Sequence, residues 1–120
     1  MRVVVAQSAH EIPDRPPIQI EVGERVEVGE RDREWPAFVF IATSRGAGWV
    51  PERHLDRDAD GAVVKEAYDT TELPTREGEE LEAIREDTRS GWIWCRAKTG
   101  REGWVPAQTL VYVGGTTSEN

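Results

Sequence analysis

A repeat of about 55 residues constrains the fold of this chain more than any other feature. Gly48-Trp49-Val50-Pro51 returns as Gly103-Trp104-Val105-Pro106, at an offset of 55 positions. Gly23-Glu24-Arg25-Val26 returns as Gly78-Glu79-Glu80-Leu81 at the same offset, and Ala37–Ile41 matches Gly91–Cys95. Three blocks in one order do not arise by chance. The sequence therefore predicts two copies of one small folding unit within 120 residues.

Each copy has the pattern of short β-strands. Polar and apolar residues alternate from Arg25 to Val28 and from Glu80 to Ile84, which is typical of strands with one buried face. Aromatic-rich runs follow at Phe38–Ile41 and Trp92–Cys95, and glycine-containing turns separate the runs. We therefore predict an all-β chain of two tandem small five-stranded barrels packed against each other. One short helical turn is expected after the last proline of each repeated block.

The expected domain boundaries follow the repeat. They are residues 1–57 for the first barrel, 58–113 for the second barrel and 114–120 for a flexible tail. Between the copies, Asp56–Gly61 has the composition of a short linker or tight turn. The expected first core consists of Val26, Val28, Phe40 or Ile41, Val50 and Leu55. The expected second core consists of Leu73, Leu81, Ala83, Ile93 or Cys95, Val105 and Leu110. Because the linker is short, we expect the copies to unfold as one cooperative unit.

The charge of the chain excludes several classes of partner. Fifteen basic and 23 acidic residues give a net charge of −8. Nucleic acids and anionic membranes are bound by clustered lysine and arginine, so we expect neither as a partner. No apolar run approaches the roughly 20 residues of a membrane span, and Val3–Ala6 is too short for the apolar part of a secretory signal. Cys95 is the single cysteine, and the sequence predicts a cytoplasmic monomer.

The order of these motifs resembles the Src homology 3 family, in the form of tandem bacterial variant domains. In the second copy the resemblance rests on Ala67-Tyr68-Asp69, Glu72-Leu73, Gly78-Glu79, Trp92-Ile93 and Gly103-Trp104-Val105-Pro106. In the first copy it rests on Ile18, Gly23-Glu24, Phe38-Val39, Gly48-Trp49-Val50-Pro51 and Leu55. The resemblance implies Src homology 3-like barrels that bind extended proline-rich peptides in a shallow aromatic groove.

The resemblance also implies a set of ligand-binding residues. In the second copy these are Trp92, Trp104, Pro106 and Tyr68 in the groove, with Glu72 as the partner of a basic ligand residue. In the first copy they are Phe38, Trp49 and Pro51. Thr70 and Thr109 stand where the family has aromatic residues, His54 stands at the late aromatic position, and Pro17 stands where the first copy should have an acid. We therefore expect the second copy to carry most of the recognition.

The residues leave three functions open. The first is a non-catalytic adaptor or scaffold module that binds a protein or peptide, with proline-rich or basic extended peptides as ligands. The second is an aromatic cage in which Trp92, Trp104 and Glu72 hold a cationic ligand. The third is an enzyme of unrecognised type, although the sequence contains no Ser–His–Asp set and no phosphate-binding loop. We expect no catalytic residue, no cofactor and no metal.

Several other residues have two interpretations each. Cys95 matches a small core position, which we favour over a reactive thiol. His10 and His54 have no ligand partners at metal-binding spacing and are expected at the surface. Asp56, Asp58 and Asp60 match the start of a calcium loop, but Ala67 stands where the loop needs an acid. A plain acidic turn is favoured there, and calcium binding stays open. Phe40 and Trp94 are expected at a seam between the barrels.

Overall fold

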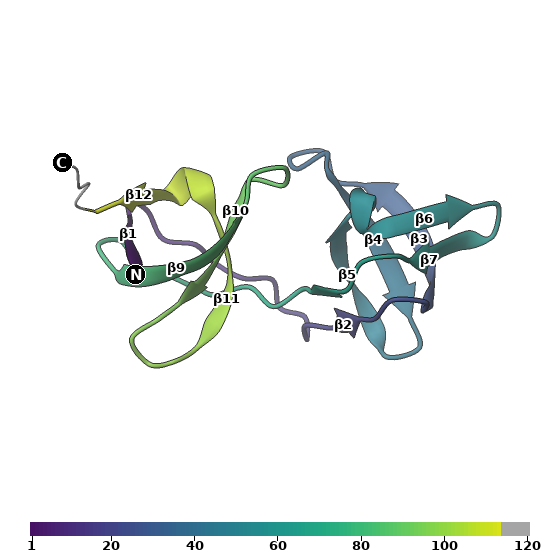
Figure 1. Cartoon of the computed structure of the whole chain (residues 1–120), viewed down its shortest axis with the longest axis horizontal. Helices are drawn as coiled ribbons and strands as arrows, with labels where there is room; N and C mark the ends of the chain where they lie inside the picture. The colour runs from purple at the N-terminus through teal and green to yellow at the C-terminus, as the bar shows by residue number, and fades with distance from the viewer. Residues whose placement is uncertain (114–120) are drawn as a thin grey trace. The chain divides into compact units, whose positions relative to one another are not determined.

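The computed structural model describes residues 1–113, which form β-strands joined by turns and two single-turn 3-10 helices (Figure 1). The expected tail, residues 114–120, lies outside the described residues. The elements in chain order are β1 (Arg2–Ala6), β2 (Gln19–Ile20), β3 (Arg25–Arg31), β4 (Phe38–Thr43), β5 (Gly46–Pro51), η1 (Glu52–His54), β6 (Leu55–Asp58), β7 (Gly61–Val64), β8 (Tyr68–Asp69), β9 (Glu80–Asp87), β10 (Trp92–Arg96), β11 (Glu102–Pro106), η2 (Ala107–Thr109) and β12 (Leu110–Tyr112).

Two five-stranded antiparallel sheets make up most of the fold, and each has the architecture of an SH3-like barrel. One sheet has the order β5-β4-β3-β7-β6, and the other has the order β11-β10-β9-β1-β12. Strands β2 and β8 form an additional two-stranded sheet. The helical turns η1 and η2 follow Pro51 and Pro106, as expected. The predicted fold class, all-β with two small five-stranded barrels, is confirmed.

The chain divides into two compact units at positions that differ from the expected boundaries. One unit, here called the continuous unit, consists of Arg15–Thr70. The other, here called the split unit, consists of Met1–Asp14 together with the chain from Thr71 onward. The expected division into residues 1–57 and 58–113 assigned β1 and β7 to the wrong barrels.

The two copies of the repeat have exchanged their first strands. Strand β1 opens the first copy, but it pairs with β9 and β12 of the second copy. Strand β7 opens the second copy, but it pairs with β3 and β6 of the first copy. The registers match: Val4 lies opposite Leu81 in the split unit, and Ala62 lies opposite Val26 in the continuous unit. Each barrel is therefore completed by a strand from the other copy.

The turn between β6 and β7 explains this exchange. Asp58 pairs with Gly61 across the turn, so the residues expected to be a linker instead close a tight β-hairpin. Gly61 has a φ of 136°, and a Cβ there would lie 2.5 Å from the Val26 carbonyl oxygen, so this position requires glycine. Asp58 also accepts two hydrogen bonds from the Arg25 guanidinium, at 3.2 and 2.8 Å. Because β7 follows β6 through this tight turn, it pairs with β6 and so belongs to the barrel of the first copy.

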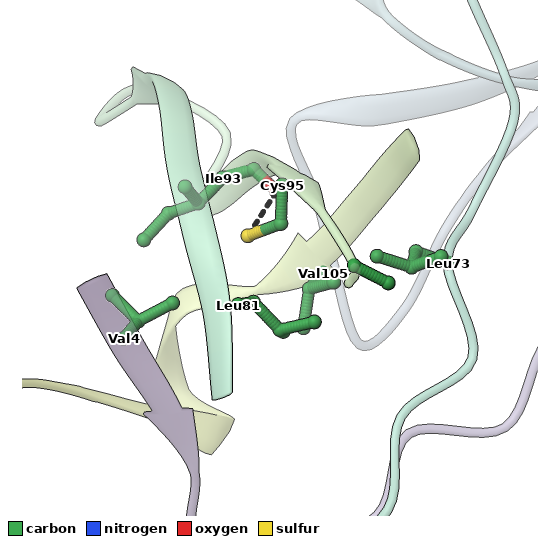
Figure 2. Packing of buried hydrophobic residues seen from close by; sticks show 7 residues of the cluster. Val4, Leu73, Leu81, Ile93, Cys95 and Val105 are labelled. Atoms are coloured by element: carbon green, nitrogen blue, oxygen red, sulfur yellow. Dashed lines mark hydrogen bonds between the residues drawn. The ribbon is translucent and has the colours of Figure 1, made fainter. Parts of the chain in front are cut away.

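The core of the split unit combines the start of the chain with its second half. The buried cluster contains Val4, Leu73, Leu81, Ile93, Cys95, Ala97 and Val105 (Figure 2). Ala83, Ala107 and Leu110 are partly buried and pack against it. The residues expected in the second core are all present. Val4 was not expected there, and it enters through the strand exchange. Burial raises the pKa of the Cys95 thiol to about 12, so the predicted core role of this cysteine is confirmed.

The core of the continuous unit follows the prediction in part. Val26, Ile41, Val50 and Leu55 are buried, as expected. Val28 is half-buried, so its expected place in the core is wrong, and of the alternatives Phe40 and Ile41 it is Ile41 that lies in the core. The register between β3 and β4 shifts after Val28, which displaces this end of β3. Further fully buried side chains that the prediction did not include are Ile20, Val39, Ala62 and Val64.

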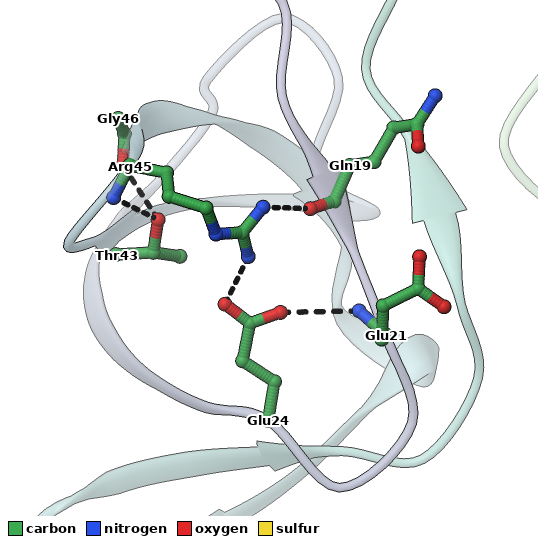
Figure 3. A network of polar contacts seen from close by, with 6 residues as sticks. All are labelled: Gln19, Glu21, Glu24, Thr43, Arg45 and Gly46. Atoms are coloured by element: carbon green, nitrogen blue, oxygen red, sulfur yellow. Dashed lines mark hydrogen bonds and ion pairs between the residues drawn. The ribbon is translucent and has the colours of Figure 1, made fainter.

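A polar network fixes the segment that leads into β3 in the continuous unit (Figure 3). The Arg45 guanidinium donates to the Gln19 carbonyl oxygen at 2.7 Å and forms an ion pair with Glu24. The other oxygen of Glu24 accepts from the Glu21 N–H at 3.1 Å. The hydrogen bond from Arg45 is the main cause that lowers the pKa of Glu24. These contacts join β2 and the β4–β5 turn, and so hold one wall of the barrel in place.

Candidate ligand-binding site

The outer face of the β10–β11 hairpin carries the aromatic residues of the split unit. Because side chains alternate along a strand, Ile93, Cys95 and Val105 face the core. The other set faces outward: Trp92 lies opposite Pro106, and Trp94 lies opposite Trp104. The expected groove residues Trp92, Trp104 and Pro106 therefore share one face. Their exposure is low, since Trp92 is 9% exposed and Trp104 is 4% exposed.

Trp94 and Trp104 form an edge-to-face pair with ring centroids 5.2 Å apart. The Trp94 indole N–H donates to Glu102 at 2.8 Å, and the Arg96 guanidinium donates to the second Glu102 oxygen at 2.8 Å. These two donors lower the pKa of the Glu102 carboxyl, with the Trp94 hydrogen bond as the larger cause. The Arg85 guanidinium lies 5.5 Å from the centre of the Trp104 ring. The Trp104 ring is thus already in contact with Trp94 and Arg85 of its own chain.

A cluster of His10, Glu72 and Trp92 lies at one end of this face. The Nε2 atom of His10 is 2.9 Å from Oε1 of Glu72. The His10 and Trp92 rings meet edge to face with centroids 5.4 Å apart. Because a carboxylate accepts the hydrogen bond, Nε2 carries the proton that joins the two side chains. The side chains remain 13% exposed at His10 and 24% exposed at Glu72, so the carboxylate is still accessible to solvent.

The backbone around Glu72 explains why this acid reaches the hairpin. The Trp104 N–H donates to the Thr71 carbonyl oxygen at 2.9 Å, and the Leu73 N–H donates to the Trp104 carbonyl oxygen at 3.0 Å. Glu72 is thereby held beside β11 by a parallel bridge. A Cβ at Gly103 would lie 2.7 Å from the Glu72 carbonyl carbon. The glycine of the repeated Gly-Trp-Val-Pro block therefore has a structural function, because it lets the Glu72 backbone approach β11.

The strand exchange separates Tyr68 from the residues with which it was grouped. Tyr68 lies in β8 of the continuous unit, where Phe38, Trp49 and Pro51 also lie, and not in the unit of Trp92. Its place in the split unit is taken by His10. The strand registers show this equivalence. Ala6 pairs with Leu110 in the split unit, and Val64 pairs with Leu55 at the same place in the continuous unit. His10 and Tyr68 each come four residues after that paired residue, so they occupy equivalent positions. Glu72, Trp92, Trp104 and Pro106 do lie in one unit.

His10 and His54, both expected at the surface, lie instead in the two candidate sites. His54 is buried, and its ring meets the Tyr68 ring edge to face at 5.0 Å. The Nδ1 atom of His54 lies 3.1 and 3.2 Å from the carbonyl oxygens of Glu66 and Ala67. Since carbonyl oxygens accept, Nδ1 carries a proton. The sequence signal for His10 was Ala9-His10-Glu11, which matches Ala67-Tyr68-Asp69 at an offset of 58 rather than 55.

The continuous unit repeats the outer aromatic pair but not the acidic cluster. Phe40 and Trp49 meet edge to face at 5.0 Å, and the Arg15 guanidinium lies 5.4 Å from the centre of the Phe40 ring. Phe38 and Tyr68 are buried. Pro17 occupies the repeat position of Glu72, so this unit has no acid at the matching place. The two candidate sites therefore differ in charge.

Asp56, Asp58 and Asp60 belong to the β6–β7 hairpin. Asp58 accepts from Arg25, and it also accepts from the Asp60 N–H at 2.9 Å. Throughout residues 1–113, no group of three or more His, Cys, Asp or Glu side chains is placed to hold a metal ion. The interpretation as an acidic turn fits this arrangement. In the same residues, no helix is long and apolar enough to cross a bilayer.

A comparison with known families gives the match that the geometry suggests. Residues 64–113 match the family model of the variant SH3 domain. The SH3 match contains Glu72, Trp92, Trp104 and Pro106, and it supports a non-catalytic module that binds protein or peptide partners. Residues 64–70 of the SH3 match lie in the continuous unit, whereas the rest lies in the split unit. No curated protein matches the chain.

Proposed function

We propose that this chain is a non-catalytic adaptor module that binds an extended basic or proline-rich peptide of a protein partner. The split unit carries the main site in this proposal. The observation that supports it is the cluster of His10, Glu72 and Trp92, in which a solvent-accessible carboxylate adjoins an indole ring. A guanidinium of the ligand would pair with Glu72, and apolar ligand residues would contact the part of Trp92 that remains exposed, which is 9% of its surface.

The charge of the split unit is compatible with the same assignment. Residues 1–14 and 71–120 together contain 7 basic and 11 acidic side chains, a net charge of −4, and residues 15–70 contain 8 and 12, also a net charge of −4, so the position of Glu72 rather than net charge distinguishes the two units. A negative field around Glu72 favours encounter with basic peptides and disfavours nucleic acid and anionic lipid. A reducing cytoplasm is the compartment that suits the single buried thiol of Cys95.

The alternative of an aromatic cage has less support. A cage needs accessible ring faces around the cation. Trp104 is 4% exposed, and Arg85 already lies over its ring. A methylated lysine would therefore have to displace a guanidinium of the protein itself. The geometry favours recognition of the cation by the Glu72 carboxylate rather than by Trp104.

The test begins with a peptide array that contains proline-rich sequences with and without arginine, and methyl-lysine sequences. The best arginine peptide is then titrated calorimetrically against wild type and Glu72→Gln, beside the same peptide with citrulline in place of arginine. We expect Glu72→Gln to weaken binding of the arginine peptide by about tenfold, because a charge-assisted hydrogen bond is lost. Binding of the citrulline peptide should change little.

Glu77→Gln is the matched control. It removes one negative charge from an exposed position of the same unit and has no hydrogen bond to the cluster. It should leave the affinity for the arginine peptide within about twofold of wild type. If Glu72→Gln and Glu77→Gln have the same effect, the proposed contact is wrong. If the array selects methyl-lysine and not arginine peptides, the cage is the better assignment.

A further inference from the structure

Strand β12 forms an open edge of the sheet in the split unit (Figure 1). Within residues 1–113, β1 is its only strand partner. The Val113 N–H donates to the Val3 carbonyl oxygen at 2.9 Å, and the Gln7 N–H donates to the Thr109 carbonyl oxygen at 2.7 Å. Hydrogen-bonded pairs alternate along an antiparallel ladder. The backbone N–H and C=O of Tyr112 therefore point away from β1, toward the open edge.

The side chains beside this edge are apolar. Val111 is 46% exposed and Val113 is 50% exposed. Val111 lies opposite Val5, and Val113 is bonded to Val3. Because Val4 and Leu110 face the core, these four valines share the outer face of the β1–β12 ribbon. We call Val3, Val5, Val111 and Val113 the valine face.

The equivalent edge of the continuous unit is protected by charges. Strand β6 occupies the repeat position of β12, and Asp56, Arg57 and Asp58 correspond to Val111, Tyr112 and Val113. Charged side chains on an edge strand prevent it from pairing with another chain. The same fold position is therefore charged in one unit and uncharged in the other. Of these two equivalent edges, β12 is the one suited to strand addition.

Tyr112 is also held in place before any partner arrives. Its hydroxyl donates to Glu86 at 3.2 Å, and the Arg2 guanidinium lies 4.4 Å from the ring centre. These contacts fix the end of β12 against β1 and β9. The free N–H and C=O of the strand are therefore presented in a defined direction, which lowers the entropy lost on pairing.

We propose that β12 pairs antiparallel with β12 of a second copy of this chain, about a twofold axis at Tyr112. In this register each Tyr112 donates its N–H to the C=O of the other, and Val111 lies beside Val113 of the second copy. The strand is a suitable partner for itself because Leu110–Tyr112 and Val113 carry no charge. This proposal replaces the monomer that the sequence predicts.

The acidic surface of the chain does not prevent this association. The nearest acids on the outer face are Glu80 and Glu82 of β9, which pair with β1. In the joined sheet, β9 of one copy lies five strand spacings from β9 of the other, about 24 Å. This exceeds the Debye length of about 8 Å at physiological salt, so the repulsion is screened. The short strand gives a small interface, in the class of weak and transient contacts.

The test is the concentration dependence of the full chain from about 10 µM to about 1 mM, the range in which weak interfaces assemble. Sedimentation velocity measures the mass, and the amide resonance of Tyr112 reports the edge itself. We expect the sedimentation coefficient to rise with concentration and the Tyr112 resonance to shift. The amide of Arg57, at the equivalent position of the charged edge, should not shift.

Val111→Lys places a charge on the edge and should weaken the association at least about tenfold. The substitution also makes the chain less negative, which reduces the repulsion between two copies. This general effect would strengthen association, so a weakened association must come from the charge on the edge. Asp56→Asn raises the charge by the same one unit at the equivalent position of the other unit and should not weaken association. Thermal unfolding of each variant shows that it is folded. A chain that stays monomeric at about 1 mM, or a Tyr112 resonance that does not move, overturns the proposal.

Discussion

The exchange of first strands determines which fragments of this chain can fold alone. A fragment of residues 1–57 follows the sequence repeat but lacks β7 and β8. It therefore loses Val64 and Ala62, which are fully buried in the continuous unit, and the buried Tyr68. Burial of Val64 and Tyr68 is worth about 2 kcal/mol each, and burial of Ala62 about 1 kcal/mol. The expected loss is about 5 kcal/mol, before the lost pairing of β7 with two strands is counted.

This loss is as large as the stability of the unit. A domain the size of Arg15–Thr70 has a free energy of unfolding of about 3 to 8 kcal/mol. We therefore expect residues 1–57 to be unfolded, and residues 15–70 to unfold cooperatively on heating. Far-UV circular dichroism and urea titration of both fragments measure this. A cooperative transition of residues 1–57 as stable as that of residues 15–70 would refute the exchange.

A disulfide tests the same feature in the full chain. Val5 lies opposite Val111, at a spacing that a disulfide can span. Without the exchange, β1 would pair with β6, and Val5 would lie opposite Asp56. The Val5→Cys/Val111→Cys variant should therefore oxidise to an intramolecular disulfide, and Val5→Cys/Asp56→Cys should not. The native Cys95 will not interfere, since burial raises its pKa to about 12.

Three further predictions concern single positions. Gly61→Ala should lower the free energy of unfolding by about 2 kcal/mol or more, because φ is 136° and the new Cβ would lie 2.5 Å from the Val26 carbonyl oxygen. Gly29→Ala is the control, because its Cβ would make an ordinary contact at 3.5 Å, and it should be nearly neutral in the same urea titration. His10→Phe keeps a ring beside Trp92 but removes the donor to Glu72, and should lower the free energy of unfolding by about 1 kcal/mol; a melting temperature equal to that of wild type would contradict the hydrogen bond. The raised pKa of Cys95 favours the folded state below the unfolded-state pKa of 9.0, and this contribution should be lost as the pH rises from there toward about 12; Cys95→Ser should remove this part of the alkaline stability profile, and an unchanged profile would contradict it.

Much of each barrel could be predicted because most strands and core residues are indicated by patterns within a short stretch of sequence. The alternation around Leu81, the apolar run that contains Ile93 and the final Leu110 predicted three strands and three core residues of the split unit. The pairing partner of the first strand could not be predicted in the same way. Strands β1 and β7 are both short and rich in valine, and either would fit either barrel. The choice depends on the length of the Asp58–Gly61 turn, which alternation does not report.

The site residues that come from the second copy were predicted correctly as one group. The residue that the strand exchange brings in from the first copy was missed. Glu72, Trp92, Trp104 and Pro106 lie in the second copy and remain in one unit. Tyr68 was assigned to them by its order in the sequence, and His10 was overlooked because it comes from the other copy. The offset of 58 between Ala9-His10-Glu11 and Ala67-Tyr68-Asp69 was the available signal. It differs from the offsets of 54 and 55 of the other blocks, so a search at one fixed offset misses it.

The position of the continuous unit within the chain gives the protein an order of mechanical failure. The first and last strands that the structure describes, β1 and β12, both belong to the split unit and pair with each other, with Val4 opposite Tyr112. A force on the two chain ends therefore separates these strands one residue pair at a time. The continuous unit is inserted between residues 14 and 71 of the split unit, so tension along the chain reaches it once the split unit opens. Its own ends are joined by the Thr70 N–H, which donates to the Ile18 carbonyl oxygen at 2.9 Å. A stretched molecule should therefore lengthen in two steps, with the inserted barrel always the second to extend.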